Sequence, residues 1–132
     1  MEKLGLARNI EELTPEHTVD EDVLKSSRDE VLNLTSNRNA VVLIIPSRGL
    51  WNGKNSERER QFHARFIDLL TEAKLNVLDV KPRLERDGHA LDFYFATDPH
   101  WNAAGQGVAG EELAKFIRDN PALFYRSKET KK

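Results

Sequence analysis

Ala40-Val-Val-Leu-Ile-Ile-Pro46 is the stretch of the sequence that decides the fold. A continuous apolar run rich in β-branched residues is typical of a parallel strand that is covered on both faces. Pro46 cannot donate a backbone hydrogen bond, so we expect the strand to end there. The run is far shorter than the roughly 20 apolar residues of a membrane span, which favours a buried strand.

The residues after this strand predict a helix and a second strand. Residues 47–55 (SRGLWNGKN) are expected to form a loop, and Ser56 with Glu59 fits a capping box at a helix start. Over residues 56–74 an apolar stripe recurs at the helical period. It consists of Phe62, Phe66, Leu69, Leu70 and Ala73. Residues 75–80 (LNVLDV) predict a second strand, and a strand–helix–strand order with tight joints builds a parallel sheet.

Two further helices flank this unit. Residues 20–34 place Leu24, Val31 and Leu34 near one helical face, with acidic residues in the first turn. Residues 102–118 predict a final helix with Asn102 as its N-cap. Its expected buried face consists of Val108, Leu113, Phe116 and Ile117. The glycines at 105, 107 and 110 weaken this helix intrinsically, and we expect them to allow close packing against a sheet or loop.

Between these elements, residues 81–96 are the least regular, and residues 93–95 are the only candidate for a third strand. The alternating order predicts an α/β fold. We expect an irregular acidic arm over residues 1–19, a domain over 20–120 and a basic tail over 121–132. A covered parallel sheet usually has more than two or three strands, so the apolar strand 40–46 predicts self-association or pairing with a missing part of the domain.

Composition excludes several classes of function. The chain has 132 residues, no cysteine and a formal net charge of −2, so disulfide frameworks, zinc ribbons and thiol nucleophiles are excluded. The near balance of charge provides no field for a polyanion, and we expect no nucleic-acid partner. We also find no secretion signal and no membrane span. If Met1 is the native start, a cytoplasmic protein is predicted. If the chain is a piece of a longer protein, the sequence gives no address and an extracytoplasmic location stays open.

The strongest candidate for chemistry is Asp98-Pro99-His100, just ahead of the last helix. A carboxylate near an imidazole fixes its tautomer and stabilises its charged form, which suits a general base. Pro99 limits backbone freedom, and Trp101 is placed to exclude water from such a site. The alternative is that Asp98-Pro99 is a turn and His100 an incidental polar residue.

Other residues are weaker candidates. Ser47 follows a strand, but it lacks the glycine-flanked elbow of a nucleophilic serine, so a turn is favoured. Trp51, in a Gly-rich loop, is a candidate contact for a substrate or partner. His17 and His63 are expected to face solvent. One possible metal set consists of His89, Asp92, Asp98 and His100, but its spacing matches no familiar zinc pattern, and we expect neither metal nor cofactor.

Two segments resemble a known family. Tyr94-Phe-Ala-Thr-Asp98-Pro-His100-Trp-Asn102-Ala-Ala-Gly105 and Val108-Ala-Gly-Glu-Glu-Leu-Ala-Lys-Phe-Ile117 are similar to the last block of SGNH (GDSL-like) hydrolases. The resemblance covers roughly residues 28–118, of which the Asp-Pro-His-Trp-Asn element is the specific part. It implies a flavodoxin-like three-layer α/β fold. It also implies that Asp98 orients His100 and that His100 acts as base on a serine. Beside this pair, the possible substrate contacts are Trp101, Asn102, Trp51 and Ser47.

The sequence departs from the family in two ways. One residue separates Asp98 from His100 where many members have two, as in the subset related to polysaccharide O-acetyl transfer. The family's N-terminal Gly-Asp-Ser block and its oxyanion donors are absent from this sequence. The resemblance therefore implies a C-terminal portion of the domain that is inactive alone.

Three functions remain open from the sequence. The first is a serine ester hydrolase or O-acyltransferase portion acting on a small ester or an acylated carbohydrate. The second is a non-catalytic module that binds a glycan or peptide through Trp51 and Trp101. The third is a metal-assisted hydrolase that uses the four-residue set above.

Overall fold

The computed structural model describes residues 20–124 and shows a mixed α/β fold. In chain order its elements are α2 (Glu21–Thr35), β1 (Val42–Ile44), the 3-10 helix η1 (Arg48–Leu50), α3 (Ser56–Glu72), β2 (Val77–Asp79), α4 (Lys81–Glu85), the 3-10 helix η2 (Ala90–Phe93), α5 (Ala103–Asp119) and α6 (Pro121–Phe124). The acidic arm predicted for residues 1–19 lies outside the described residues. Of the basic tail predicted for residues 121–132, the part beyond residue 124 also lies outside the described residues, and residues 121–124 form α6.

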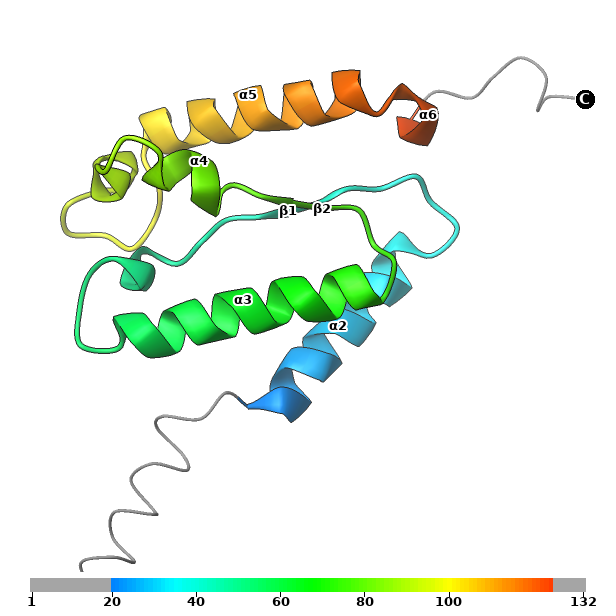
Figure 1. Cartoon of the computed structure of the whole chain (residues 1–132), viewed down its shortest axis with the longest axis horizontal. Coiled ribbons are helices and arrows are strands. Elements are labelled where there is room, and N and C mark those ends of the chain that lie inside the picture. The colour runs from blue at the N-terminus through cyan, green and yellow to red at the C-terminus, as the bar shows by residue number, and fades with distance from the viewer. Residues whose placement is uncertain (1–19, 125–132) are drawn as a thin grey trace, which may run out of the picture.

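The predicted strand–helix–strand unit is confirmed. β1 and β2 pair in parallel, with Val42 opposite Val77 and Ile44 opposite Asp79, and α3 connects them. Each strand has three residues, so both are shorter than the sequence pattern predicts. Figure 1 shows α3 and α5 on opposite sides of the two strands, with α2 packed beside α3.

The third strand predicted at residues 93–95 is wrong. The chain forms η2 up to Phe93, and Tyr94 makes a single antiparallel bridge to Trp101. The Asn102 N–H donates to the Phe93 carbonyl and the Phe95 N–H donates to the His100 carbonyl. The segment is therefore paired with its own continuation instead of with β2. The region 81–96 is also more regular than expected, because α4 begins at Lys81 with Pro82 in its first turn, where a proline is tolerated.

The expected burial of both faces of the first strand is wrong as well. Residues 40–45 are only half-buried, because the described sheet has two strands and each is therefore an edge. The Val42 N–H donates to the Asn76 carbonyl, and the Ile44 carbonyl accepts from the Val80 N–H. Backbone groups alternate in direction along a strand, so those of Leu43 point away from β2. Within residues 20–124 no hydrogen bond reaches them.

The core lies where α3 meets the ends of the strands. Leu50, Leu69, Leu70 and Val80 are almost completely buried, which confirms the centre of the predicted α3 stripe. In α2 only Leu24 is buried and Leu34 is 73% exposed, so only part of the apolar face of this helix packs into the core. A second cluster, which we call the α5 cluster, joins α4, η2 and α5. It consists of Leu84, Ala90, Tyr94 and Val108, with Trp51, Phe93 and Trp101 packed against it.

The capping box predicted at the start of α3 is wrong. The N-cap residue is Asn55, and it makes no side-chain hydrogen bond to the helix. Ser56 is the first helical residue, and the Glu59 side chain lies close to Gly49. The Glu59 side chain thus contacts η1 instead of the N-cap backbone N–H that a capping box requires. Across the described part of the chain, no helix has both the length and the apolar character that crossing a bilayer requires.

Candidate active site

Asp98 and His100 lie in the loop between η2 and α5, and this loop is closed by backbone hydrogen bonds at its base. The Phe95 N–H donates to the His100 carbonyl at 3.0 Å, and the Asn102 N–H donates to the Phe93 carbonyl at 2.9 Å. The bridge between Tyr94 and Trp101 lies between these two bonds. The loop therefore has a fixed base from which Asp98 and His100 extend.

Asn102 holds the loop to the helix and confirms its predicted role as N-cap. Its Oδ1 accepts from the Gly105 N–H at 3.0 Å, while its Nδ2 donates to the Asp92 carbonyl at 2.8 Å and to the Tyr94 carbonyl at 3.2 Å. These bonds occupy the amide within the fold. Asn102 therefore caps α5 and holds the base of the Asp98 loop.

The predicted close approach at the glycines of α5 is confirmed for Gly105 only. A Cβ atom at Gly105 would lie 2.5 Å from the Phe93 carbonyl oxygen and 3.0 Å from the Trp101 Cβ. Gly107 and Gly110 have no neighbour within 4 Å of such an atom, so the expectation is wrong for them. The absence of a side chain at Gly105 is what lets α5 approach the Asp98 loop.

Asp98 and His100 form a carboxylate–imidazole pair. Asp98 Oδ1 accepts from the backbone N–H of His100 at 2.8 Å and also contacts the ring Nδ1. The backbone hydrogen bond, then the ring contact and the charge of Arg48, hold the pKa of the Asp98 carboxyl below its ordinary value. Because Nδ1 faces the carboxylate, Nε2 is left for a substrate or nucleophile. The His100 side chain is 78% exposed and that of Asp98 52% exposed.

The serines among residues 20–124 are not hydrogen-bonded to His100, whose side-chain partner is Asp98. The Ser47 hydroxyl accepts from the Gly49 N–H at 3.1 Å and caps η1. Ser47 is therefore placed as the turn residue that its sequence context favours.

Arg48 brings the loop after β1 against the Asp98 loop, which the sequence did not indicate. Its guanidinium NH2 donates to the Ala96 carbonyl at 2.7 Å. A backbone carbonyl has no sequence signature, so no motif announces this contact. Beside it lies a cavity of about 520 Å³. Its lining consists of Arg48, Leu91, Asp92, Tyr94, Phe95 and Ala96.

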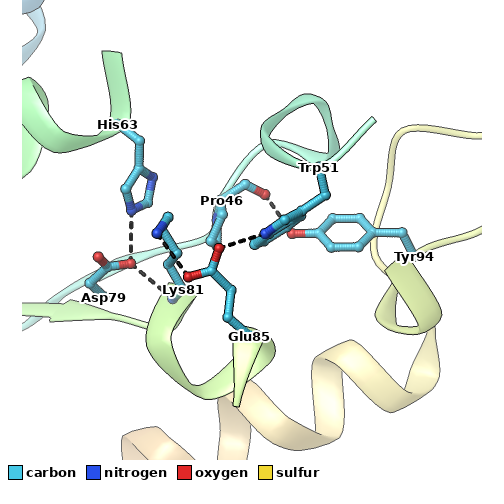
Figure 2. A network of polar contacts seen from close by, with 7 residues as sticks. All are labelled: Pro46, Trp51, His63, Asp79, Lys81, Glu85 and Tyr94. Atoms are coloured by element: carbon cyan, nitrogen blue, oxygen red, sulfur yellow. Dashed lines mark hydrogen bonds and ion pairs between the residues drawn. The ribbon is translucent and has the colours of Figure 1, made fainter. Parts of the chain in front are cut away.

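The two tryptophans differ in what they touch. Trp101 packs against the α5 cluster, as does Trp51. Trp51, however, also lines a second cavity, of about 490 Å³, together with Glu85 and residues 88–92; we call it the Trp51 cavity. The Trp51 Nε1–H donates to Glu85 Oε2 at 2.7 Å, and the Lys81 ammonium contacts Glu85 Oε1 at 2.8 Å (Figure 2). Burial works to raise the pKa of Glu85, but these two hydrogen bonds together with the positive charges of Lys81 and Arg60 leave that pKa below its ordinary value.

His63 does not face solvent, so that prediction is wrong. Its side chain is 8% exposed, and its Nε2 lies 2.9 Å from Asp79 Oδ1 (Figure 2). The same carboxylate oxygen accepts from the Lys81 N–H at 2.9 Å. The reason is the crossover geometry, which places the end of β2 beside α3. A polar side chain at a strand end with a histidine on the connecting helix is the signal that would have indicated this pair.

The possible metal set is not brought together. Among residues 20–124, no three His, Cys, Asp or Glu side chains gather in a way that would hold an ion. His89 and Asp92 line the Trp51 cavity, whereas His100 lies in the Asp98 loop.

Comparison with known proteins identifies the family. Residues 21–132 match the family model described as the SGNH hydrolase-like domain of the acetyltransferase AlgX. No curated protein and no solved structure matches the chain significantly. The family match covers most of the chain and confirms the resemblance found in the Asp-Pro-His-Trp-Asn block, so a function of the hydrolase and acetyltransferase type is supported in general. The chain belongs to the family of AlgX-type SGNH hydrolase-like domains.

Proposed function

We propose that this chain carries the Asp–His part of a serine-dependent ester hydrolase or O-acyltransferase, which acts on a small ester or an acylated carbohydrate. Asp98 orients His100, and His100 Nε2 takes the proton from an attacking serine hydroxyl. Positioned general-base help of this kind contributes about 10²–10⁴-fold in rate.

The observation that carries the proposal is the double contact of Asp98. One carboxylate oxygen receives both the backbone N–H and the ring Nδ1 of His100, and the pKa of Asp98 is lowered as a result. Asp98 therefore stays ionised over the pH range in which an imidazole titrates. An ionised partner on Nδ1 stabilises the imidazolium that forms when Nε2 accepts a proton.

In this proposal the serine and the oxyanion donors come from outside residues 20–124. The exposure of His100 agrees with a site that another segment or chain covers. The free edge of β1 at Leu43 is where that segment would add a strand, which would extend the sheet toward a flavodoxin-like three-layer arrangement. Loss of a single oxyanion donor costs ~10²–10³ in rate, so the chain alone is expected to be nearly inactive.

The test compares p-nitrophenyl acetate turnover by this chain and by the longest natural chain that contains it. We expect turnover only in the longer chain, and a loss of about 10²–10⁴-fold in its His100→Ala variant. Asp98→Asn in the longer chain should also lower turnover, because it removes the ionised partner of the imidazole. Its matched control is Asp87→Asn, because Asp87 is exposed and its ion pair among residues 20–124 is the one with Arg86 at 3.7 Å. If the short chain turns over the ester and His100→Ala removes that turnover, the claim that the nucleophile lies outside this chain is refuted. If the longer chain keeps its turnover in the His100→Ala variant, His100 is not the general base.

A second candidate function is a binding module for a glycan or peptide. It is favoured by the Trp51 cavity and by the absence of a serine hydrogen-bonded to His100 among the described residues. Binding of a glycan together with a lack of His100-dependent turnover in both chains would select this function over the first.

A further inference from the structure

We propose that Arg48 is a positioning residue for the Asp98–His100 pair, because it holds the Asp98 loop against the carboxyl end of β1. This inference rests on the proposed function and adds to it a residue that lies outside the Asp-Pro-His-Trp-Asn block. The Arg48 guanidinium donates to the Ala96 carbonyl at 2.7 Å, and Ala96 lies two residues before Asp98. A change at Arg48 should therefore reach the pair without touching either of its members.

The Asp98 loop has little packing of its own to fix it. Residues 95–100 are all exposed, and the Asp98 carboxylate accepts hydrogen bonds from His100, which lies in the same loop. Within the described part of the chain, the Arg48–Ala96 bond is the one hydrogen bond that joins residues 95–100 to another element. Loops with few buried contacts open at low cost in free energy. The Arg48 contact is therefore the main restraint on the outer part of this loop.

Arg48 extends from a segment that is itself anchored on both sides. It is the first residue of η1, whose N-cap is Ser47 and whose last residue, Leu50, is almost completely buried. The preceding Pro46 is also buried, and its carbonyl accepts from the Tyr94 hydroxyl at 2.6 Å (Figure 2). The backbone of Arg48 is thus held by the core, and its half-buried side chain has a fixed starting point from which to hold the loop.

Arg48 also brings a positive charge to the pair. The backbone N–H and the ring of His100 are the main causes of the lowered pKa of Asp98, and the charge of Arg48 lowers that pKa further. Two other carboxylates are near: Asp92 lines the same cavity as Arg48, and Glu59 of α3 packs against η1. Neither forms an ion pair with Arg48 among residues 20–124, so its charge acts on Asp98 without being neutralised by them. An ionised Asp98 is what stabilises the imidazolium during proton transfer.

NMR on this chain tests the contact without any need for activity. Arg48→Gln removes the charge and shortens the side chain, so it should raise the pKa of Asp98 toward its ordinary value. It should also lower the backbone ¹⁵N order parameters of residues 96–98 toward the value of about 0.6 or less that marks a flexible segment. Arg48→Lys keeps the charge but loses the planar fork of donors, so it should preserve the lowered pKa of Asp98 while the order parameters still fall. Arg38→Gln, at an exposed position before the other end of β1, is the matched control and should change neither quantity.

Kinetics on the longest natural chain that contains this one test the consequence for the reaction. Arg48→Gln should lower kcat for p-nitrophenyl acetate by about 10–10²-fold, since a misplacement of about 1 Å in a reacting group costs up to about 10²-fold. KM should stay within about twofold of its original value, because Arg48 acts on the pair and not on the substrate. Arg48→Lys should recover part of kcat, and Arg38→Gln should leave it unchanged.

Two outcomes overturn the proposal. One is a folded Arg48→Gln variant whose order parameters at residues 96–98 equal those of the unmodified chain; if that variant does not fold, Arg48→Lys decides by the same measurement. The other is a raised KM at unchanged kcat, which would make Arg48 a substrate contact. His100→Ala separates this proposal from the proposed function: turnover in the longer chain that is insensitive to His100→Ala refutes the proposed function, while the order parameters still decide whether Arg48 holds the loop.

Discussion

Replacing Gly105 with alanine should destabilise the protein, although alanine is the better helix former. Gly105 lies near the start of α5, where a Cβ atom would meet the Phe93 carbonyl oxygen at 2.5 Å. That oxygen cannot move away cheaply, because it accepts the Asn102 N–H at 2.9 Å and so closes the base of the Asp98 loop. The clash therefore falls on the part of the backbone that positions Asp98 and His100.

The expected magnitude follows from two opposing terms. Overpacking a tight site costs about 1–3 kcal/mol, while replacing a helical glycine with alanine gains up to about 1 kcal/mol. Their sum is a net loss of up to roughly 2 kcal/mol at Gly105. Gly107 is the matched control, because it lies in the same helix with no neighbour within 4 Å of an added Cβ. Gly107→Ala should therefore stabilise the protein by about 0.5–1 kcal/mol.

Urea unfolding followed by circular dichroism measures both variants against the unmodified chain. The decisive quantity is the difference between them, which we expect to be about 1–3 kcal/mol in favour of Gly107→Ala. A Gly105→Ala variant as stable as Gly107→Ala would show that α5 does not approach the loop as closely as the structure indicates. If Gly105→Ala and Gly107→Ala destabilise the protein equally, helix propensity does not determine the effect of alanine at the exposed position 107.

Three further predictions concern the core and the site. Tyr94→Phe should lower the free energy of unfolding by about 1–3 kcal/mol in the same assay, because the buried carbonyl that its hydroxyl binds loses its partner. Leu70→Ala should cost about 2–5 kcal/mol, since Leu70 is fully buried, whereas Leu34→Ala at its exposed position should cost under about 0.5 kcal/mol; equal losses would contradict the described packing. A carboxyl NMR titration should give Asp98 a pKa below its ordinary value of 3.8. The ionised Asp98 therefore stabilises the folded chain fully above pH 3.8, and this stabilisation disappears as the pH falls through the lowered pKa. In His100→Ala the pKa should rise only part of the way, because the backbone N–H bond remains, and a value at or above 3.8 in the unmodified chain would contradict the pairing.

Local patterns predicted the regular elements well. The apolar run before Pro46 and the LNVLDV segment do form a parallel pair, and the stripe centred on Leu69 and Leu70 is the buried face of α3. Asn102 caps α5 as expected. These features depend on periodicity and on hydrogen bonds within a few residues, which a sequence displays directly.

Features that depend on distant partners differ from what the local sequence predicts. The sequence predicts a capping box with Glu59, whose side chain lies close to Gly49, and a solvent-facing His63, which pairs with Asp79. Residues 93–95 have the composition of a strand, but the chain turns back through the bridge between Tyr94 and Trp101. In each case a contact with a distant or folded-back segment overrode the local preference.

The strand–helix–strand unit and the Asp-Pro-His-Trp-Asn block of the SGNH type follow from the sequence, because both depend on neighbouring residues. The pairing of Asp98 with His100, two residues apart, belongs with them. Two other contacts arise only in the folded chain: Arg48 joins the loop after β1 to the Asp98 loop, and Glu85 holds Trp51 beside a cavity. They link residues 48 and 34 positions apart, so they exist only once the chain has packed.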